Sequence, residues 1–108
     1  MDFNTFQKLA QNTAGFQERN DERLVCAVLA MAGEMGELAN HIKKGIWHGH
    51  GIDPEFVLEE LGDILWYVAE TSTAMNMHLD NVAEFNIDKL KSRYPEGFSE
   101  EASINRKG

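Results

Sequence analysis

Two long runs of this chain carry apolar residues in alternating steps of four and three, and no other feature constrains the fold as much. The first run extends from about Asp21 to Lys44 and the second begins at Asp53 and Pro54. The two apolar seams consist of Leu24, Val28, Met31, Met35, Leu38 and Ile42, and of Leu58, Leu61, Leu65, Val68, Ser72 and Met75. This spacing is typical of helices that pack lengthwise. Because only a glycine- and histidine-containing loop separates the runs, they are predicted to form an antiparallel hairpin.

The expected helix ends follow from local signals. Asp21 is a suitable N-cap, Gly45 a suitable C-terminal cap, and Pro54 occupies the first helical position that proline favours. Shorter helices are expected from about Asn4 to Thr13 and from Asp80 or Asn81 to about Arg93. Residues from about 95 to 108 are expected to form a polar, extended or partly mobile tail. The sequence therefore predicts a single all-α domain over residues 1–108, a four-helix bundle that oligomerisation completes because so short a chain has little core.

The charge balance narrows the classes of partner. Eighteen acidic residues against ten basic ones give a net charge of −8, which argues against a nucleic-acid polymer or an anionic membrane as the partner. A nucleotide stays compatible, because a bound divalent cation reverses the local charge. Cys26 is the only cysteine, so neither an intramolecular disulfide nor a thiolate metal site is expected. With no signal-peptide or membrane-spanning pattern, the prediction is a cytoplasmic protein.

Four carboxylates border the two apolar seams. Glu34 and Glu37 lie three residues apart in the first long run, and Glu60 and Asp63 do so in the second. Residues three apart are neighbours on a helix surface, so packing the two helices should bring all four acids into one cluster. Such a cluster is costly unless a proton or a cation compensates it, and hard oxygen ligands suit Mg²⁺, with Mn²⁺ as a substitute. Glu59 is expected to face away from this cluster.

Several other residues could bind a substrate. Asn86, Lys89 and Arg93 form one row on the last predicted helix and could face a triphosphate, although the pattern alone favours an ordinary solvated basic edge. Lys43 could bind phosphate, or simply interact with the end of its helix. Trp47, in the loop, could stack on a base. Two other classes of protein are alternatives: a non-catalytic helical oligomerisation module, and a di-iron protein, which would need E-x-x-H pairs that neither long helix has.

The segments GEMGELANHIKKG, EELGDILWYVAE and NIDKLKSRYPEGFS, followed by SINR, resemble the MazG-like all-α nucleotide pyrophosphohydrolases. The resemblance extends over residues 5 to 106. It implies Mg²⁺-dependent hydrolysis of (d)NTP to (d)NMP and pyrophosphate, a step that can clear unwanted nucleotides from the pool. It also implies that Glu34, Glu37, Glu60 and Asp63 are metal ligands and that Lys89 and Arg93 contact phosphates. It further implies a homodimer or homotetramer. Gly33 stands where the fuller E-E-x-x-E pattern has a glutamate, which leaves the number of ions open.

Overall fold

The protein is all-helical, as the sequence predicts. The structure is a computed structural model that describes residues 1–15 and 20–105. These residues form five α-helices and no β-strand: α1 (Phe3–Gln11), α2 (Asn20–Trp47), α3 (Pro54–Ala74), α4 (Leu79–Arg93) and α5 (Glu100–Ile104). Charged residues interrupt each helix that is long enough to span a bilayer, so none in these two ranges qualifies as a transmembrane segment.

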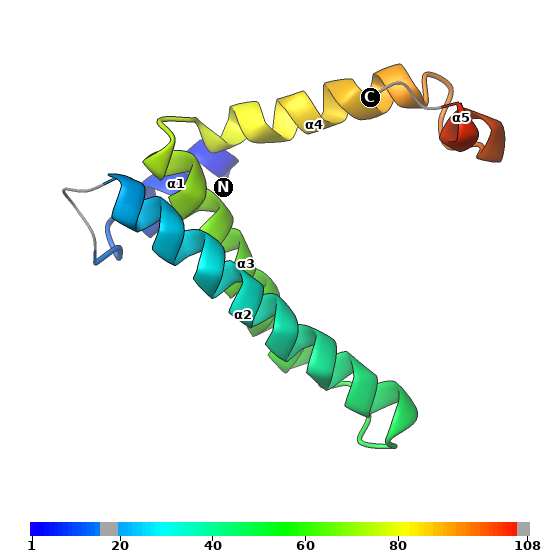
Figure 1. Cartoon of the computed structure of the whole chain (residues 1–108), viewed down its shortest axis with the longest axis horizontal. Coiled ribbons are helices and arrows are strands. Elements are labelled where there is room, and N and C mark those ends of the chain that lie inside the picture. Colours follow the sequence, from blue (N-terminus) through cyan, green and yellow to red (C-terminus); the bar gives the residue numbers. More distant parts are fainter. Residues whose placement is uncertain (16–19, 106–108) are drawn as a thin grey trace.

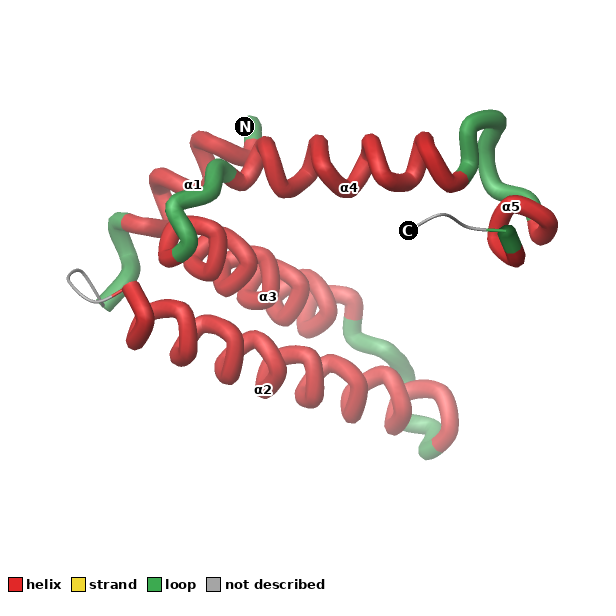
Figure 2. Tube along the Cα trace, turned by 45° about the horizontal axis from the view of Figure 1, so that its top comes forward, coloured by secondary structure: helices red, strands yellow, loops and turns green. Residues whose placement is uncertain are grey.

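Helices α2 and α3 form the predicted antiparallel hairpin, and they lie side by side along their length (Figures 1 and 2). Helix α3 begins as expected, with Pro54 in its first turn and the Asp53 carboxylate accepting a hydrogen bond of 3.0 Å from the Glu55 N–H. Helix α2 does not end at Lys44 but continues through Gly45 to Trp47. The prediction of Gly45 as a cap is therefore wrong. A Cβ at Gly45 would lie 2.7 Å from the Gly51 carbonyl oxygen, so glycine there permits the close return of the loop.

The two long helices do not bury the predicted seams fully. Leu58 is 71% exposed, and Val28, Met35 and Leu61 are exposed as well. The neighbouring row instead contributes several buried positions, which include Ala27 and Glu60. For these four seam residues the prediction of burial between the two helices is wrong, because the pattern marks an apolar stripe without specifying what covers it. The helix pair meets one position to the side, where small and polar residues lie.

Helix α4 begins earlier than predicted because α1 caps it. His78, rather than Asp80 or Asn81, is the N-cap, and it makes no side-chain capping bond. The first N–H groups of a helix lack partners within the helix. Here Gln7 Oε1 accepts a hydrogen bond of 2.8 Å from the Leu79 N–H, and Asn4 Oδ1 accepts one of 3.1 Å from the Asp80 N–H. Two side chains of α1 therefore hold the start of α4.

Beyond this start, α4 leaves the hairpin as an arm that ends in α5 (Figure 1). The radius of gyration is 16.9 Å, whereas a compact domain of this length has about 13 Å. The arm also shows that the tail is not wholly extended, since α5 forms within it and the Ser99 hydroxyl accepts a hydrogen bond of 3.0 Å from the Ala102 N–H. Residues 106–108 of the predicted tail lie outside the described part of the chain.

The core is small and lies where α1 and the start of α4 meet α3. In the described ranges its buried members are Ala10, Ala69 and Leu79, with Phe6, Trp66 and Val68 packed against them. Large apolar side chains on the arm are left uncovered, including Phe85 at 75% exposure. A single copy therefore leaves much of its apolar surface in contact with water.

Candidate functional site

The structure brings three of the four predicted acids together on the hairpin. One carboxylate oxygen each of Glu34, Glu37 and Glu60 lies within 4.8 Å of the other two. Glu34 and Glu37 come from successive turns of α2, and Glu60 comes from the facing turn of α3. Asp63 lies one turn further along α3, is exposed, and is close enough for its charge to act on Glu60. Glu59 is exposed.

Glu60 has the most perturbed environment of the cluster. Its side chain is buried, with 7% exposure. A hydrogen bond with Glu34 raises the pKa of Glu60 to about 7, together with burial and the negative charges of Glu34, Glu37 and Asp63. A carboxyl group with this pKa is partly protonated near neutrality, so the cluster holds either a proton or a cation.

The same cluster contains unsatisfied acceptors. Oε2 of Glu34 and Oε2 of Glu60 are both buried and have no hydrogen-bond partner in the described structure. Leaving a buried acceptor without a partner costs about 1–3 kcal/mol, and more when it is charged. Converging carboxylate oxygens are also the ligands that hard divalent cations prefer. The three glutamates therefore have the chemistry of a Mg²⁺ or Mn²⁺ site, and Asp63 lies within reach of its edge.

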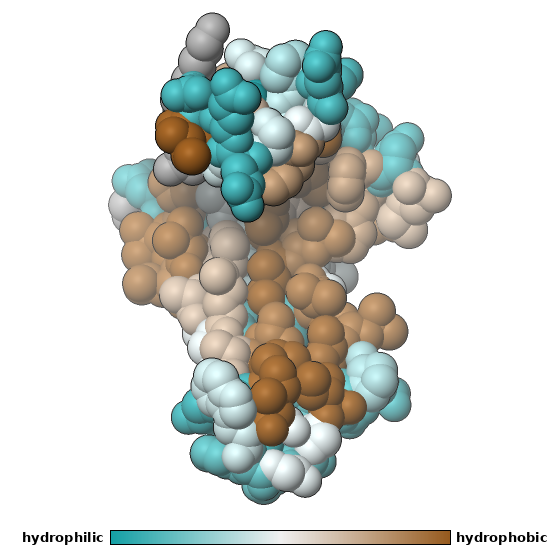
Figure 3. Space-filling model, turned by 90° about the vertical axis from the view of Figure 1, so that its right-hand side faces the viewer, coloured by the Kyte–Doolittle hydropathy of each residue, from teal (hydrophilic) through white to brown (hydrophobic). Residues whose placement is uncertain are grey.

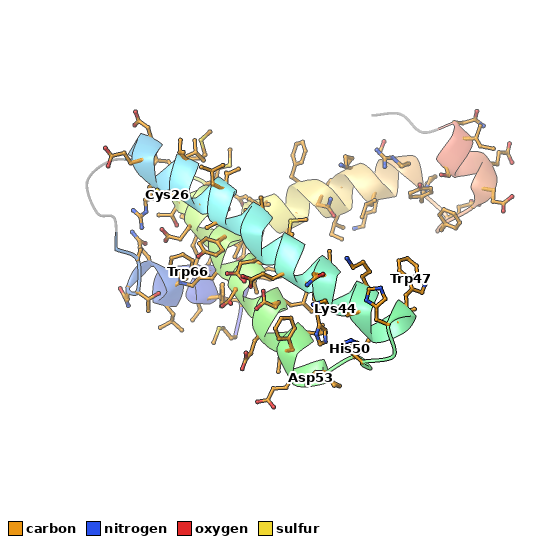
Figure 4. All side chains as sticks on the ribbon, turned by 60° about the horizontal axis from the view of Figure 1, so that its bottom comes forward. Cys26, Lys44, Trp47, His50, Asp53 and Trp66 are labelled. Atoms are coloured by element: carbon orange, nitrogen blue, oxygen red, sulfur yellow. The ribbon has the colours of Figure 1, made fainter. Side chains whose placement is uncertain are left out.

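The other predicted substrate-binding residues lie elsewhere in this chain. Asn86, Lys89 and Arg93 are on the α4 arm, which diverges from the hairpin (Figure 1). Lys43 is in the last turns of α2, and Trp47 is 77% exposed at the hairpin tip. Ten residues separate Trp47 from Glu37, a distance of about 15 Å along the helix axis. Figure 4 shows Trp47 and Trp66 toward opposite ends of the hairpin. The chain does not place its own α4 cations on its acids.

His41 continues the acidic row of α2 but serves the hairpin itself. Its Nε2 atom accepts a hydrogen bond of 3.0 Å from the Asp53 N–H, and its ring stacks on Phe56 at a centroid distance of 4.4 Å. His41 thus fixes the loop that joins the acid-bearing helices.

The sequence prediction missed a buried ion pair on the same face of the hairpin. Arg23 Nε lies 3.0 Å from Glu70 Oε2, and a second hydrogen bond of 3.2 Å joins the guanidinium to Oε1. Both side chains are 5% exposed. Arg23 lies four residues before Ala27 and therefore belongs to the row that leads to Glu34. The position of Arg23 in this row was the sequence signal that could have predicted its burial between the two helices.

The chain is therefore an all-α protein in which two helices of a hairpin contribute glutamates to one carboxylate cluster. Residues 25–98 match the MazG nucleotide pyrophosphohydrolase domain, so the chain belongs to that family, which confirms the resemblance noted from the sequence. It is also 31% identical to the Gene 37 protein of Mycobacterium phage L5 over 114 residues, covering 98% of this chain and 100% of that protein. That protein's name specifies no activity. No solved structure is significantly similar.

Proposed function

We propose that this protein is a Mg²⁺-dependent nucleoside triphosphate pyrophosphohydrolase, which converts (d)NTP and water to (d)NMP and pyrophosphate. The observation that carries the proposal is the convergence of Glu34, Glu37 and Glu60 within 4.8 Å, in a chain of the MazG family. Such a role would help to clear unwanted nucleotides from the pool. We place this activity in the cytoplasm, together with its nucleotide substrates.

The acids would act as ligands for the cation. Glu34, Glu37 and Glu60 would hold it, and Asp63 would complete the set from the next turn of α3. When bound, Mg²⁺, or Mn²⁺ in its place, supplies charge that neutralises phosphate oxygens and lowers the pKa of a water. Glu60 would hold the cation as a carboxylate, because the cation would replace the proton as the compensating charge. His41 keeps the two helices in register beside the ligands.

The proposal includes a second copy of the chain. Figure 3 shows apolar side chains gathered in a band on the side where the arm and the hairpin diverge. The exposed apolar residues of α2, α3 and α4 include Val28, Met35, Leu58, Leu61 and Phe85. A contiguous apolar surface of this kind marks an interaction site. Covering it with an identical chain buries both copies of the stripe in one symmetric contact.

Charge complementarity supports the same arrangement. Asn86 and Lys89 are exposed on an arm that leaves its own hairpin, Arg93 is half-buried at the end of that arm, and the acidic cluster lies on a chain with a net charge of −8. In a symmetric pair, the arm of each copy reaches over the hairpin of the other. We therefore propose that each triphosphate is held between the acids of one chain and the cations of its partner's α4, in a homodimer or a dimer of dimers.

The test is a screen of canonical and modified nucleoside triphosphates with Mg²⁺, followed by chromatography of the products. Monophosphate and pyrophosphate from at least one substrate support the proposal. A diphosphate and inorganic phosphate would instead place the cleavage at the γ position and refute the assigned reaction. If no triphosphate is cleaved and calorimetry detects no Mg²⁺ binding, the alternative of a non-catalytic oligomerisation module gains support.

A further inference from the structure

A pocket lies on the same face of the hairpin as the acidic cluster, toward the α1 end. It has a volume of about 220 Å³, and we call it the Trp66 pocket. Its lining includes Arg23, Ala27, Ala30, Trp66, Tyr67 and Glu70. Two alanines of α2 form one wall and two aromatic rings of α3 form the other. The buried Arg23–Glu70 pair adds a charged, hydrogen-bonding end.

The Trp66 pocket lies one helical turn away from the acids along both helices of the hairpin. Ala30 lies four residues before Glu34 on α2, and Tyr67 lies four residues after Asp63 on α3, so each side is about 6 Å from the acids along its helix. A second hollow of about 260 Å³ is lined by Asp63, Trp66 and Tyr67. The two hollows share both aromatic residues, which links the pocket to the acid row.

The walls of the pocket are held in place. Trp66 Nε1 donates a hydrogen bond of 2.8 Å to Thr13 Oγ1 of the segment after α1. Trp66 and Tyr67 meet edge to face, with ring centroids 5.0 Å apart. Because the indole N–H is already used, the Trp66 ring acts as an apolar surface. The pocket is thus preformed before any ligand binds.

A nucleobase matches this chemistry. It is a flat aromatic ring that packs on aromatic and small apolar side chains, and its edge carries hydrogen-bonding groups. Each oxygen of Glu70 accepts one bond from Arg23 and retains lone pairs that can accept an N–H from a base edge. We propose that the Trp66 pocket receives the nucleobase of the substrate while the phosphates lie at the acidic cluster. This rests on the function proposed above.

Filling the pocket tests the proposal by kinetics. Ala30→Leu adds bulk to the alanine wall, whereas Ala32→Leu makes the same change at an exposed position of the same helix. We expect Ala30→Leu to raise KM for nucleoside triphosphates by about tenfold or more, the scale on which a misplaced methylene discriminates in a pocket. The control should keep the KM of the wild-type chain. Mg²⁺ binding by calorimetry should be the same in both variants, and circular dichroism should confirm that both are folded.

A binding measurement tests the pocket without catalysis. In a Trp47→Phe chain the only remaining tryptophan is Trp66, so its fluorescence reports on the pocket. Titration with nucleoside 5′-monophosphates in the absence of divalent cation should change the emission saturably, whereas ribose 5-phosphate should not. Ala30→Leu in the same background should abolish the change. An equal response to ribose 5-phosphate, or none to any nucleotide, would overturn the proposal.

The two proposals fail in different ways. If the wild-type chain cleaves triphosphates but Ala30→Leu retains its KM, the pocket assignment is wrong and the proposed function stands. If the wild-type chain cleaves none, the proposed function is wrong, and the fluorescence titration still decides whether the pocket binds a base. The titration of the unfilled pocket also keeps the proposal testable if Ala30→Leu does not fold.

Discussion

Removing one partner of the Arg23–Glu70 pair should destabilise the protein strongly. Both side chains are 5% exposed, and two hydrogen bonds of 3.0 and 3.2 Å join them. Arg23→Met leaves the Glu70 carboxylate buried without its counter-ion, which costs about 3–5 kcal/mol. A domain of this size is stable by about 5–15 kcal/mol in total, so the variant should approach the limit of folding. Its melting temperature should fall by more than about 10 °C.

The assay is a double-mutant cycle in urea and by thermal melting, at one fixed protein concentration because oligomerisation shifts apparent stability. Glu70→Leu alone should behave like Arg23→Met, because it strands the guanidinium. The double variant should lose less than either single variant, since it removes both buried charges together. Glu59→Gln, at an exposed position on α3, is the control and should change stability by less than about 0.5 kcal/mol. Additive losses in the double variant would refute the reasoning.

Further predictions concern the cluster, the hairpin tip and the arm. The pKa of Glu60 is about 7 in the folded chain, against an ordinary value of 4.5. Between pH 4.5 and 7 the metal-free folded chain therefore binds more protons than the unfolded chain. Its free energy of unfolding should therefore fall as pH rises from about 4.5 to 7, and thermal melts with Mg²⁺ should not show this fall. Glu37→Gln or Asp63→Asn should abolish turnover with the helical circular dichroism retained; turnover with Mg²⁺ in either would contradict the proposed site. Gly45→Ala should lower the melting temperature, because its Cβ would lie 2.7 Å from the Gly51 carbonyl oxygen, and an unchanged melt would show that the loop adapts. Mixing inactive Glu37→Gln and Lys89→Ala chains should restore about a quarter of wild-type activity if sites are shared across a symmetric pair, and none if each chain serves its own acids.

Local signals predicted the helices well, and contacts between helices explain where they did not. Asp53 and Pro54 mark the start of α3 because capping depends on adjacent residues. Gly45 misled because its role concerns the returning loop rather than the end of its own helix. The start of α4 depends on Gln7, more than 70 residues away in the chain, and no local pattern indicates such a partner.

The candidate site likewise has a part that local spacing predicts and a part that depends on contacts between helices. Glu34 and Glu37, three residues apart, share a helix face by geometry alone, so two of the three members of the cluster follow from spacing. Its meeting with Glu60 required the correct pairing of two helices, which the apolar seams indicated to within one position. Arg23 and Glu70 were not paired in the prediction, because an isolated arginine near a helix start looks like a solvated residue until its partner is known.

Because α1 caps the start of α4, the first helix sets the direction in which the long α4 arm extends. Asn4 and Gln7 grip only the base of α4, whose 15 residues extend about 22 Å beyond it. A rotation of 10° at that base would swing Arg93 by about 4 Å, enough to break or make a phosphate contact. The position of the α4 cations therefore depends on two amide side chains near the N-terminus that are not part of the acidic cluster. Changes at Asn4 or Gln7, or bulky additions before Phe3, should therefore change the orientation of the arm while leaving the carboxylates unaltered.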